Sequence, residues 1–149
     1  MWYIIDMTVV YIDMCADLFH WGHVNLLKNA KSMGDKLIVG IHSDESIKKY
    51  KREPIMKMKE RIAVVESCKY VDVVVPDAPL TITEEYIKTH NIDLVVHAHH
   101  EHEDEKYKFM YGIANDMGKF KRLDYSEGVS TTEIINRIQN NKDKYNSIN

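Results

Sequence analysis

Continuous apolar runs rich in β-branched residues alternate along the chain with segments whose apolar residues recur at helical spacing. A strand with one wet face would alternate apolar and polar residues, whereas a continuous run indicates burial on both faces, as in a parallel sheet. The pattern predicts five strands, at Val9–Asp13, Lys36–Ile41, Val71–Val75, Leu94–His97 and, more weakly, Phe120–Asp124.

The segments between these runs predict helices. In the first of them, apolar residues recur at three- and four-residue spacing, as in a helix that packs on a sheet; they are Val24, Leu26, Leu27, Ala30 and Met33. Alternating strands and helices predict an α/β fold, a Rossmann-like three-layer sandwich with a five-stranded parallel sheet and right-handed crossovers. Ligands of such folds bind beyond the carboxyl ends of the strands. The predicted helices are His23–Met33, Ser43–Tyr50, Lys57–Lys69, Thr83–His90, Glu105–Met117 and Thr131–Asn140.

Length and composition narrow the class of protein. The 149 residues are enough for a single domain over 1–149, with a core over about 8–138 and a frayed polar tail over 141–149. A net charge of −3 and the lack of a basic stripe argue against a nucleic-acid partner. No apolar run is long enough to span a membrane, and two cysteines do not make a disulfide framework. A cytoplasmic protein is therefore expected.

The segment His20-Trp-Gly-His23 follows the first predicted strand and leads into the first predicted helix. Two histidines three residues apart at a helix start can face one ligand. The unpaired backbone N–H groups and the positive end of the helix dipole favour an anion such as phosphate there. A capping turn with two surface histidines is the alternative, but the order of strand, loop and helix favours phosphate binding.

A second candidate helix start lies at Glu127-Gly-Val-Ser-Thr-Thr-Glu133. Ser130 and Glu133 have the spacing of a capping box, which is by itself the more frequent explanation. Three hydroxyls after a glycine also make an anion pocket, and two such helix starts suit a nucleoside triphosphate. The basic stretch Lys48–Arg52 between them is mostly a solvated face, in which one or two residues could close over phosphates as a lid.

The segment His97-Ala-His-His-Glu-His-Glu-Asp104 gathers histidines and acids at the end of a predicted strand. Such residues can bind a transition metal, but this segment lacks the spacing and the cysteines of a structural zinc site. We therefore expect no dedicated metal site. A protonatable acidic loop close to a substrate amine or to Mg²⁺ is the preferred interpretation.

Taken together, these segments resemble the cytidylyltransferases that make CDP-alcohols, namely the ethanolamine-phosphate, choline-phosphate and glycerol-3-phosphate cytidylyltransferases. The resemblance runs from about Val9 to Ile138. H-x-G-H alone occurs in many nucleotidyltransferases of this fold, but together with a later G-[IV]-S-T-T motif it is specific for the cytidylyl branch. The landmarks are Asp17–His23, Ala30–Gly40, Ser43–Glu45, Lys69–Val75 and Glu127–Thr132.

The resemblance implies transfer of CMP from CTP to a phospho-alcohol, with release of pyrophosphate and with Mg²⁺ accompanying CTP. It implies that His20, His23 and Lys51 are catalytic, Lys51 being the lid lysine, and that Lys51 and Arg61 contact the substrate phosphate. It also implies a homodimer through the Lys69–Val75 segment. The nucleotide-binding residues that it implies are Cys15, Ala16, Asp17, His20, Gly22, His23, Glu127, Gly128, Ser130, Thr131 and Thr132, with Asp17 ordering the first loop.

The sequence departs from the family pattern in four places. Met14 replaces a glycine, Ala16 a phenylalanine, and Ala98-His99-His100 the usual acidic or Gly-Asp positions. Tyr125 replaces the arginine of R-T-x-G-[IV]-S-T, a phosphate-binding cation for which Arg122 or Lys121 could substitute. These departures leave open a nucleotide-binding relative with weakened turnover. A glycerol-3-phosphate cytidylyltransferase and an adenylyltransferase of the same fold also stay open as functions.

The choice of alcohol depends on how the ammonium group would be bound. A quaternary ammonium favours an aromatic cage, but Leu80 stands where the choline enzymes of the family have a tryptophan. A primary ammonium needs acceptors and carboxylates, which Glu101, Glu103 and Asp104 could supply. Ethanolamine phosphate is therefore the preferred substrate, with choline phosphate next.

Overall fold

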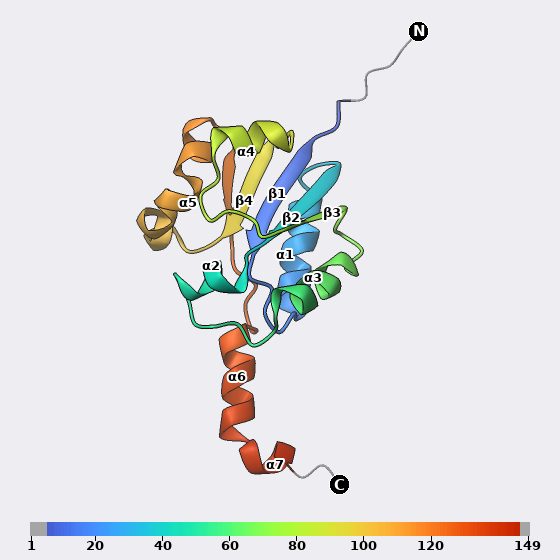
Figure 1. Ribbon diagram of the computed structural model, residues 1–149, viewed down its shortest axis with the longest axis vertical. Coiled ribbons are helices and arrows are strands. Elements are labelled where there is room, and N and C mark those ends of the chain that lie inside the picture. Colours follow the sequence, from blue (N-terminus) through green and yellow to red (C-terminus); the bar gives the residue numbers. More distant parts are fainter. Residues whose placement is uncertain (1–5, 147–149) are drawn as a thin grey trace.

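Five parallel strands form one sheet at the centre of the protein, in a computed structural model that describes residues 6–146 (Figure 1). The order of the strands is β3-β2-β1-β4-β5. This arrangement confirms the predicted α/β Rossmann-like fold. The strands are β1 (Val9–Met14), β2 (Lys36–Ile41), β3 (Val73–Pro76), β4 (Leu94–Ala98) and β5 (Phe120–Leu123).

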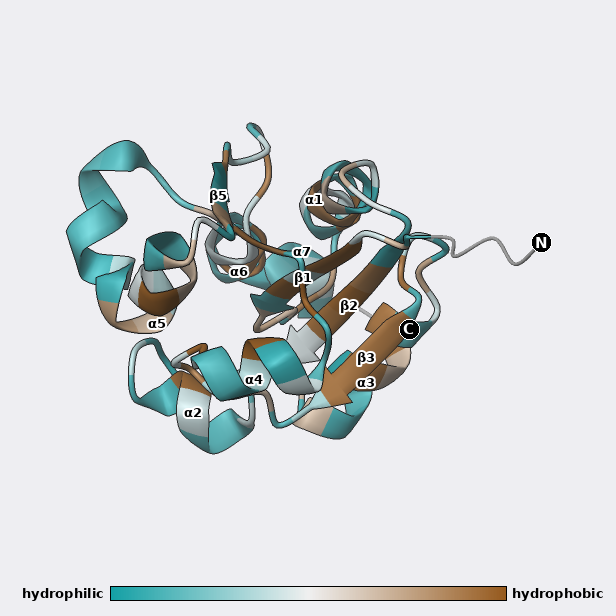
Figure 2. Ribbon diagram, turned by 90° about the horizontal axis from the view of Figure 1, so that it is seen from above, coloured by the Kyte–Doolittle hydropathy of each residue, from teal (hydrophilic) through white to brown (hydrophobic). Residues whose placement is uncertain are grey.

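Helices cover both faces of the sheet, because successive residues of the central strand point to opposite sides. Val10 and Ile12 of β1 pack with α1 (Trp21–Lys31) and α3 (Met58–Glu66), whereas Val9 and Tyr11 pack with α4 (Glu84–Thr89) and α5 (Asp104–Asp116). Figure 2 shows the apolar strands between helices whose outer surfaces are hydrophilic. The three layers of the sandwich are thus two helical layers and the sheet.

The order of the strands reverses at β1, which pairs with β2 on one side and with β4 on the other. In open α/β sheets a crevice forms at such a switch point, beyond the carboxyl ends of the strands. The chain leaves β1 at Met14 and β4 at Ala98, so the loops that follow these residues border the crevice.

The remaining elements are short or stand apart from the sheet. A 3₁₀ turn (Glu101–Glu103) precedes α5, and α2 (Asp44–Lys48) follows β2. The helix α6 (Thr131–Asn140) has no buried residue and extends away from the sheet, followed by α7 (Lys142–Asn146) (Figure 1). No helix within residues 6–146 combines the length and the apolar character needed to cross a membrane.

Several predicted boundaries need correction. The first helix begins at Trp21 rather than His23, because the side chain of His20 caps it. The third strand is Val73–Pro76 rather than Val71–Val75, and α3 ends at Glu66. In the tail predicted over 141–149, residues 142–146 form α7, and residues 147–149 lie outside the described part of the chain.

Candidate active site

Two adjoining cavities, of about 440 and 390 Å³, open at the carboxyl ends of β1 and β4. They share His23, Lys51 and Thr131 among their lining residues, so they form one continuous cleft. We call the larger the inner cavity and the smaller the outer cavity. Of the predicted site residues, Cys15, Ala16, Asp17, His23, Lys51, Thr131 and Thr132 line the inner cavity, and His20, Gly22, His23, Lys51, Ser130, Thr131 and Thr132 line the outer cavity.

The two histidines of the H-x-G-H motif hold each other at the start of α1. The Nδ1 of His20 accepts a hydrogen bond from the amide of Gly22 at 3.1 Å, and the Nδ1 of His23 accepts one from the amide of His20 at 3.1 Å. An imidazole nitrogen that accepts from an amide carries no proton, so in each neutral ring the proton is on Nε2. Both Nε2–H groups are therefore donors, and His23 lines both cavities.

Gly22 lets His20 fold back over the helix start. A Cβ atom at this position would lie 2.9 Å from the ring of His20 and 2.9 Å from the side chain of Val129. Contacts this short would push the imidazole away from the Gly22 amide. The motif therefore needs a glycine at position 22, because the imidazole of His20 packs closely against the backbone there.

Burial keeps both imidazoles neutral. Burial, together with the nearby His20 and Lys51, lowers the pKa of His23 to about 3. Burial also lowers the pKa of His20 below its ordinary value. At neutral pH the pair therefore presents two uncharged N–H donors, while Lys51 supplies positive charge at the same cleft.

The start of α6 meets this histidine pair. The hydroxyl of Thr131 donates to the carbonyl oxygen of Asp17 at 2.9 Å and lies 3.4 Å from the Nε2 of His20, from which it can accept. Ser130 caps the helix by accepting from the amide of Glu133 at 3.0 Å. The capping box and the anion pocket are therefore compatible. Glu127 and Gly128 do not line either cavity; Gly128, with φ +86°, turns the chain toward the helix.

Asp17 joins the first loop to the segment that carries Lys51. Its carboxylate accepts from the amides of Ile55 and Met56, each at 2.9 Å, and pairs with Arg52 at 3.0 Å. Burial raises the pKa of Asp17, but these hydrogen bonds and the Arg52 charge outweigh it, and the pKa is lowered overall. The resemblance implies that Asp17 orders the loop after β1, and its hydrogen bonds also reach the segment after α2.

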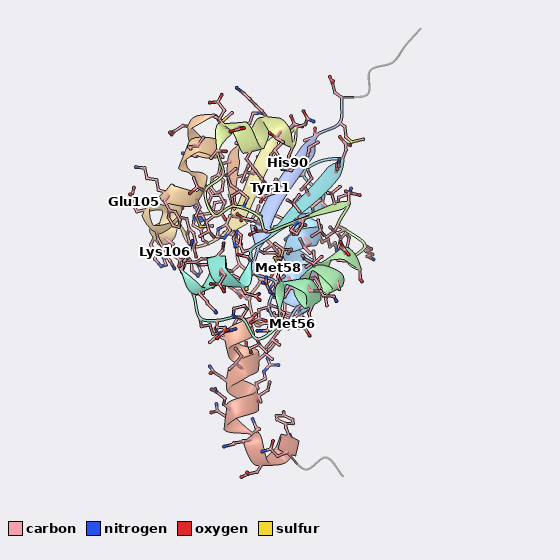
Figure 3. The ribbon with its side chains drawn as sticks, viewed as in Figure 1. Tyr11, Met56, Met58, His90, Glu105 and Lys106 are labelled. Carbon is pink, nitrogen blue, oxygen red and sulfur yellow. The ribbon has the colours of Figure 1, made fainter. Side chains whose placement is uncertain are left out.

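Arg61 is not in the cleft, contrary to the prediction that it contacts a substrate phosphate. Its guanidinium is fully buried and donates to the carbonyl oxygens of Met56 and Cys15 and to the carboxylate of Asp44. Figure 3 shows Met56 and Met58 at the start of α3, the helix that carries Arg61. Arg61 therefore fastens α3 to the loop behind the cleft.

The floor of the inner cavity is a buried polar network that the sequence analysis missed. Asp13, at the end of β1, accepts hydrogen bonds from the hydroxyl of Tyr111 and from the Nε2 of His42, which lies at 3.2 Å. The Nδ1 of His42 in turn accepts from the hydroxyl of Tyr50 at 2.7 Å. Asp13 and His42 stand at the carboxyl ends of adjacent strands, where ligand-binding side chains are expected. The place of each residue at the end of a predicted strand could have identified it as a candidate site residue.

The histidine and acid cluster after β4 divides between the cleft and the surface. His97 lines the inner cavity, whereas His99 is buried behind it and bonds to Asp104. Glu101 and Glu103 do not line the inner cavity, because the 3₁₀ turn carries them away from it. The prediction that these acids meet a substrate ammonium is therefore not supported.

The inner cavity contains aromatic rings although Leu80 does not line it. The tyrosines at its wall are Tyr50, Tyr107 and Tyr125. These rings come from α5 and from the loops after α2 and β5, whereas the sequence argument considered only the position of Leu80. Burial raises the pKa of Tyr125 to about 12, so it is a neutral hydroxyl and not the cation of the family motif. Arg122 does not replace that cation, since it pairs with Asp104 outside the cleft.

Within the described residues, no group of three or more histidine, cysteine, aspartate or glutamate side chains is placed to hold a metal ion. Asp17 lines the cleft, but its oxygens are bonded to Arg52 and to two amides. A divalent cation at this site would therefore take most of its oxygen ligands from the phosphates of a bound nucleotide and from water.

Comparisons with known proteins agree with this geometry. The profile of a family described as cytidylyltransferase-like matches residues 11–137. Over 129 residues the chain is 43% identical to an ethanolamine-phosphate cytidylyltransferase of Dictyostelium discoideum, covering 87% of this chain and 36% of that protein. Over 138 residues it is 39% identical to choline-phosphate cytidylyltransferase A of Mus musculus, covering 91% and 38% respectively.

Among solved structures, a lipopolysaccharide core biosynthesis protein of Thermoplasma volcanium has the same fold. Its TM-score is 0.66 at 22% identity, over 83% of this chain and all of that one. The chain spans less than two fifths of the length of the two curated relatives.

Proposed function

The chain belongs to the cytidylyltransferase-like family, and on this premise we propose that it transfers CMP from CTP to ethanolamine phosphate, giving CDP-ethanolamine and pyrophosphate. The observation that carries the proposal is the meeting of two helix starts in one cleft, joined by the His20–Thr131–Asp17 contacts. Relatives named ethanolamine-phosphate cytidylyltransferase, at 37–43% identity, support the choice of reaction.

The triphosphate of CTP would bind across the two helix starts. The unpaired amides of α1 and α6 and the hydroxyls of Ser130 and Thr132 supply donors for phosphate oxygens. Lys51, which lines both cavities, adds a positive charge where the two substrates would meet. The outer cavity thus suits the β- and γ-phosphates, and the inner cavity suits the phospho-alcohol.

The reaction needs no nucleophilic side chain. A phosphate oxygen of ethanolamine phosphate attacks the α-phosphorus of CTP, a new P–O–P link forms, and the bond to the β-phosphate breaks as pyrophosphate leaves. His20 and His23 donate their Nε2–H groups to the charge that develops on the α-phosphoryl oxygens, and they do so as neutral imidazoles. Mg²⁺ bound to CTP supplies further neutralisation of the triphosphate.

The inner cavity suits a cationic head group. The carboxylate of Asp13 lies beneath its floor, shielded from solvent, where a negative charge attracts a cation strongly. The tyrosines of the wall favour choline phosphate as a second candidate, because aromatic faces also bind a quaternary ammonium. Glycerol 3-phosphate carries no cation and would gain no attraction from this carboxylate.

Two further parts of the proposal concern the whole protein. We place it in the cytoplasm, and we propose a homodimer formed through the edge strand β3 and the residues before it, from Lys69 to Val75. Val73 on this strand is exposed, as an interface residue would be in an isolated protomer.

A panel of substrates tests the function. Pyrophosphate release is measured with CTP, ATP, GTP and UTP, each with ethanolamine phosphate, choline phosphate and glycerol 3-phosphate. We expect CTP with ethanolamine phosphate to give the highest kcat/KM. Release with ATP alone would identify an adenylyltransferase. CTP binding without turnover would identify a relative that has lost activity, and a preference for glycerol 3-phosphate would overturn the choice of alcohol.

A further inference from the structure

Four side chains form a line from the surface to the inner cavity. The Nε of Arg122 lies 3.4 Å from the carboxylate of Asp104, and the same carboxylate oxygen lies 2.7 Å from the Nε2 of His99. The Nδ1 of His99 then lies 2.9 Å from the Nδ1 of His97, which lines the cavity. His99 is almost completely buried, whereas Asp104 is half exposed.

Asp104 determines the direction of the hydrogen bonds in this line. An ionised carboxylate can only accept, and this carboxylate pairs with the guanidinium of Arg122. His99 must therefore donate from Nε2, and in the neutral ring its Nδ1 is then an acceptor. For the contact between the two Nδ1 atoms to be a hydrogen bond, His97 must donate from its own Nδ1. The Nε2 of His97 is consequently left with a lone pair.

This lone pair is open to the cavity. Within residues 6–146, every side-chain nitrogen or oxygen that is shut off from solvent has a hydrogen-bond partner. The Nε2 of His97 has no partner in that part of the chain, so it is accessible, and the inner cavity is the space that His97 lines. The rings of Tyr107 and Tyr111, each with its centroid 4.7 Å from that of His97, hold the imidazole in this orientation.

We propose that His99 and Asp104 are positioning residues, which fix His97 in the tautomer whose Nε2 accepts a hydrogen bond in the inner cavity and thereby favour a primary over a quaternary ammonium. A primary ammonium has N–H groups to donate to this acceptor, whereas a trimethylammonium has none. The tyrosines of the wall accommodate either cation, so the selectivity between them comes from the Nε2 of His97, which accepts a hydrogen bond. The proposal depends on the proposed function, because it concerns the choice between two substrates of that reaction.

Two substitutions interrupt this line of hydrogen bonds at residues that do not line the inner cavity. Asp104→Ala removes the acceptor that fixes His99, and His99→Phe keeps a buried ring but ends the line. Glu105→Ala is the matched control, because Glu105 is an exposed acid in the same first turn of α5 and does not line the inner cavity, and Figure 3 shows it on the outer side of that helix. Each protein is assayed at saturating CTP with ethanolamine phosphate and with choline phosphate.

We expect both variants to raise the KM for ethanolamine phosphate roughly five- to tenfold, as for the loss of one hydrogen bond to a charged group. The kcat, and the kcat/KM for choline phosphate, should change less than about twofold. Glu105→Ala should behave as the unmodified protein. An unchanged ratio of the two kcat/KM values in both variants, or an equal loss with both substrates, would overturn the proposal.

A spectroscopic measurement tests the tautomer independently of turnover. In ¹⁵N-histidine-labelled protein, the Nδ1 of His97 should give the shift of a protonated nitrogen and Nε2 that of an unprotonated one. Asp104→Ala should give averaged shifts. A protonated Nε2 in the unmodified protein would refute the line of hydrogen bonds. If no phospho-alcohol were turned over, the proposed function would fail. The spectrum would still determine the tautomer of His97, and calorimetry would still measure how Asp104→Ala changes the binding of ethanolamine phosphate.

Discussion

At the scale of single residues, the histidine pair shows how a backbone contact determines chemistry. Because each Nδ1 accepts from an amide, only Nε2–H remains for a ligand, and burial keeps both rings uncharged at neutral pH. The sequence predicts that these histidines face a phosphate, and the structure places both at the cleft. The protonation state could not be predicted from sequence, because it depends on burial and on which amides the rings meet.

The first prediction concerns His23. Replacing it with alanine removes a preorganised donor, so we expect kcat to fall about a hundredfold or more. The variant also loses the bond to the His20 amide, which should cost about 1 kcal/mol of stability. Steady-state kinetics and thermal melts measure the two effects. Thr83→Ala is the control, because it removes the cap of α4 alone and should lower stability without lowering kcat. A His23→Ala enzyme with near-normal kcat would refute the catalytic role.

Arg61 is buried away from the cleft, whereas the resemblance implies that it contacts a substrate phosphate. Its buried guanidinium bonds to two loops, so we expect Arg61→Gln to lower the free energy of unfolding by roughly 3 kcal/mol, as when a buried ion pair loses one partner. Urea denaturation measures this loss. Where the variant is folded, the KM for ethanolamine phosphate should stay within about threefold of normal. A large rise in KM with unchanged stability would instead place Arg61 at the substrate phosphate.

At the scale of elements, local patterns predict the existence of helices and strands better than their ends. All five strands and the helices α1 to α6 were predicted, the strands from continuous apolar runs and the helices from the segments between them. The start of α1 was missed because a histidine, an infrequent capping residue, occupies the N-cap. The place of Asp13 and of His42 at the end of a strand could have been read from the sequence, but their contact depends on the pairing of β1 with β2 and could not.

The helix α6 makes an element-scale prediction, because it contributes to the cleft only through its first turn. Thr132 lines both cavities, where its hydroxyl can meet the outer phosphates of CTP. We expect Thr132→Ala to weaken CTP binding about tenfold and CMP binding less than about twofold, since CMP lacks those phosphates. Isothermal calorimetry with both nucleotides measures this. Thr83→Ala, which removes the cap of α4 away from the cleft, is the control for a lost cap. An equal effect of Thr132→Ala on both nucleotides would leave this residue a structural role only.

At the scale of the whole molecule, the buried histidines link stability to pH. The pKa of His23 is lowered to about 3 and that of His97 to about 4, chiefly by burial, against about 6.5 in the unfolded chain. Below pH 6.5 the unfolded state therefore binds more protons, and stability falls as the pH falls toward the folded-state values. Between pH 7.5 and pH 5 we expect a loss of roughly 2 kcal/mol for each histidine.

Urea denaturation at the two pH values measures this loss. The carboxylate of Asp17, whose pKa is lowered, loses its contribution only at more acid pH, so this window reports on the histidines. In His97→Gln the pH-dependent loss should shrink by roughly 2 kcal/mol. The same loss in the variant as in the unmodified protein would show that His97 is not buried in its neutral form.

The last prediction concerns assembly. The strand β3 is an edge strand, and Val73 on it and Val64 on α3, which packs against β3, are exposed to 37% and 36%. Pro76 ends the strand and has no N–H to donate, so we expect two protomers to meet through side chains rather than by extending the sheet.

Light scattering after size exclusion should give twice the chain mass of 17.5 kDa. Val73→Lys should give monomers, because a stable interface does not bury an unpaired charge. Phe109→Lys, at an exposed apolar position on α5, should remain dimeric. A Val73→Lys dimer would move the interface to another face of the protein.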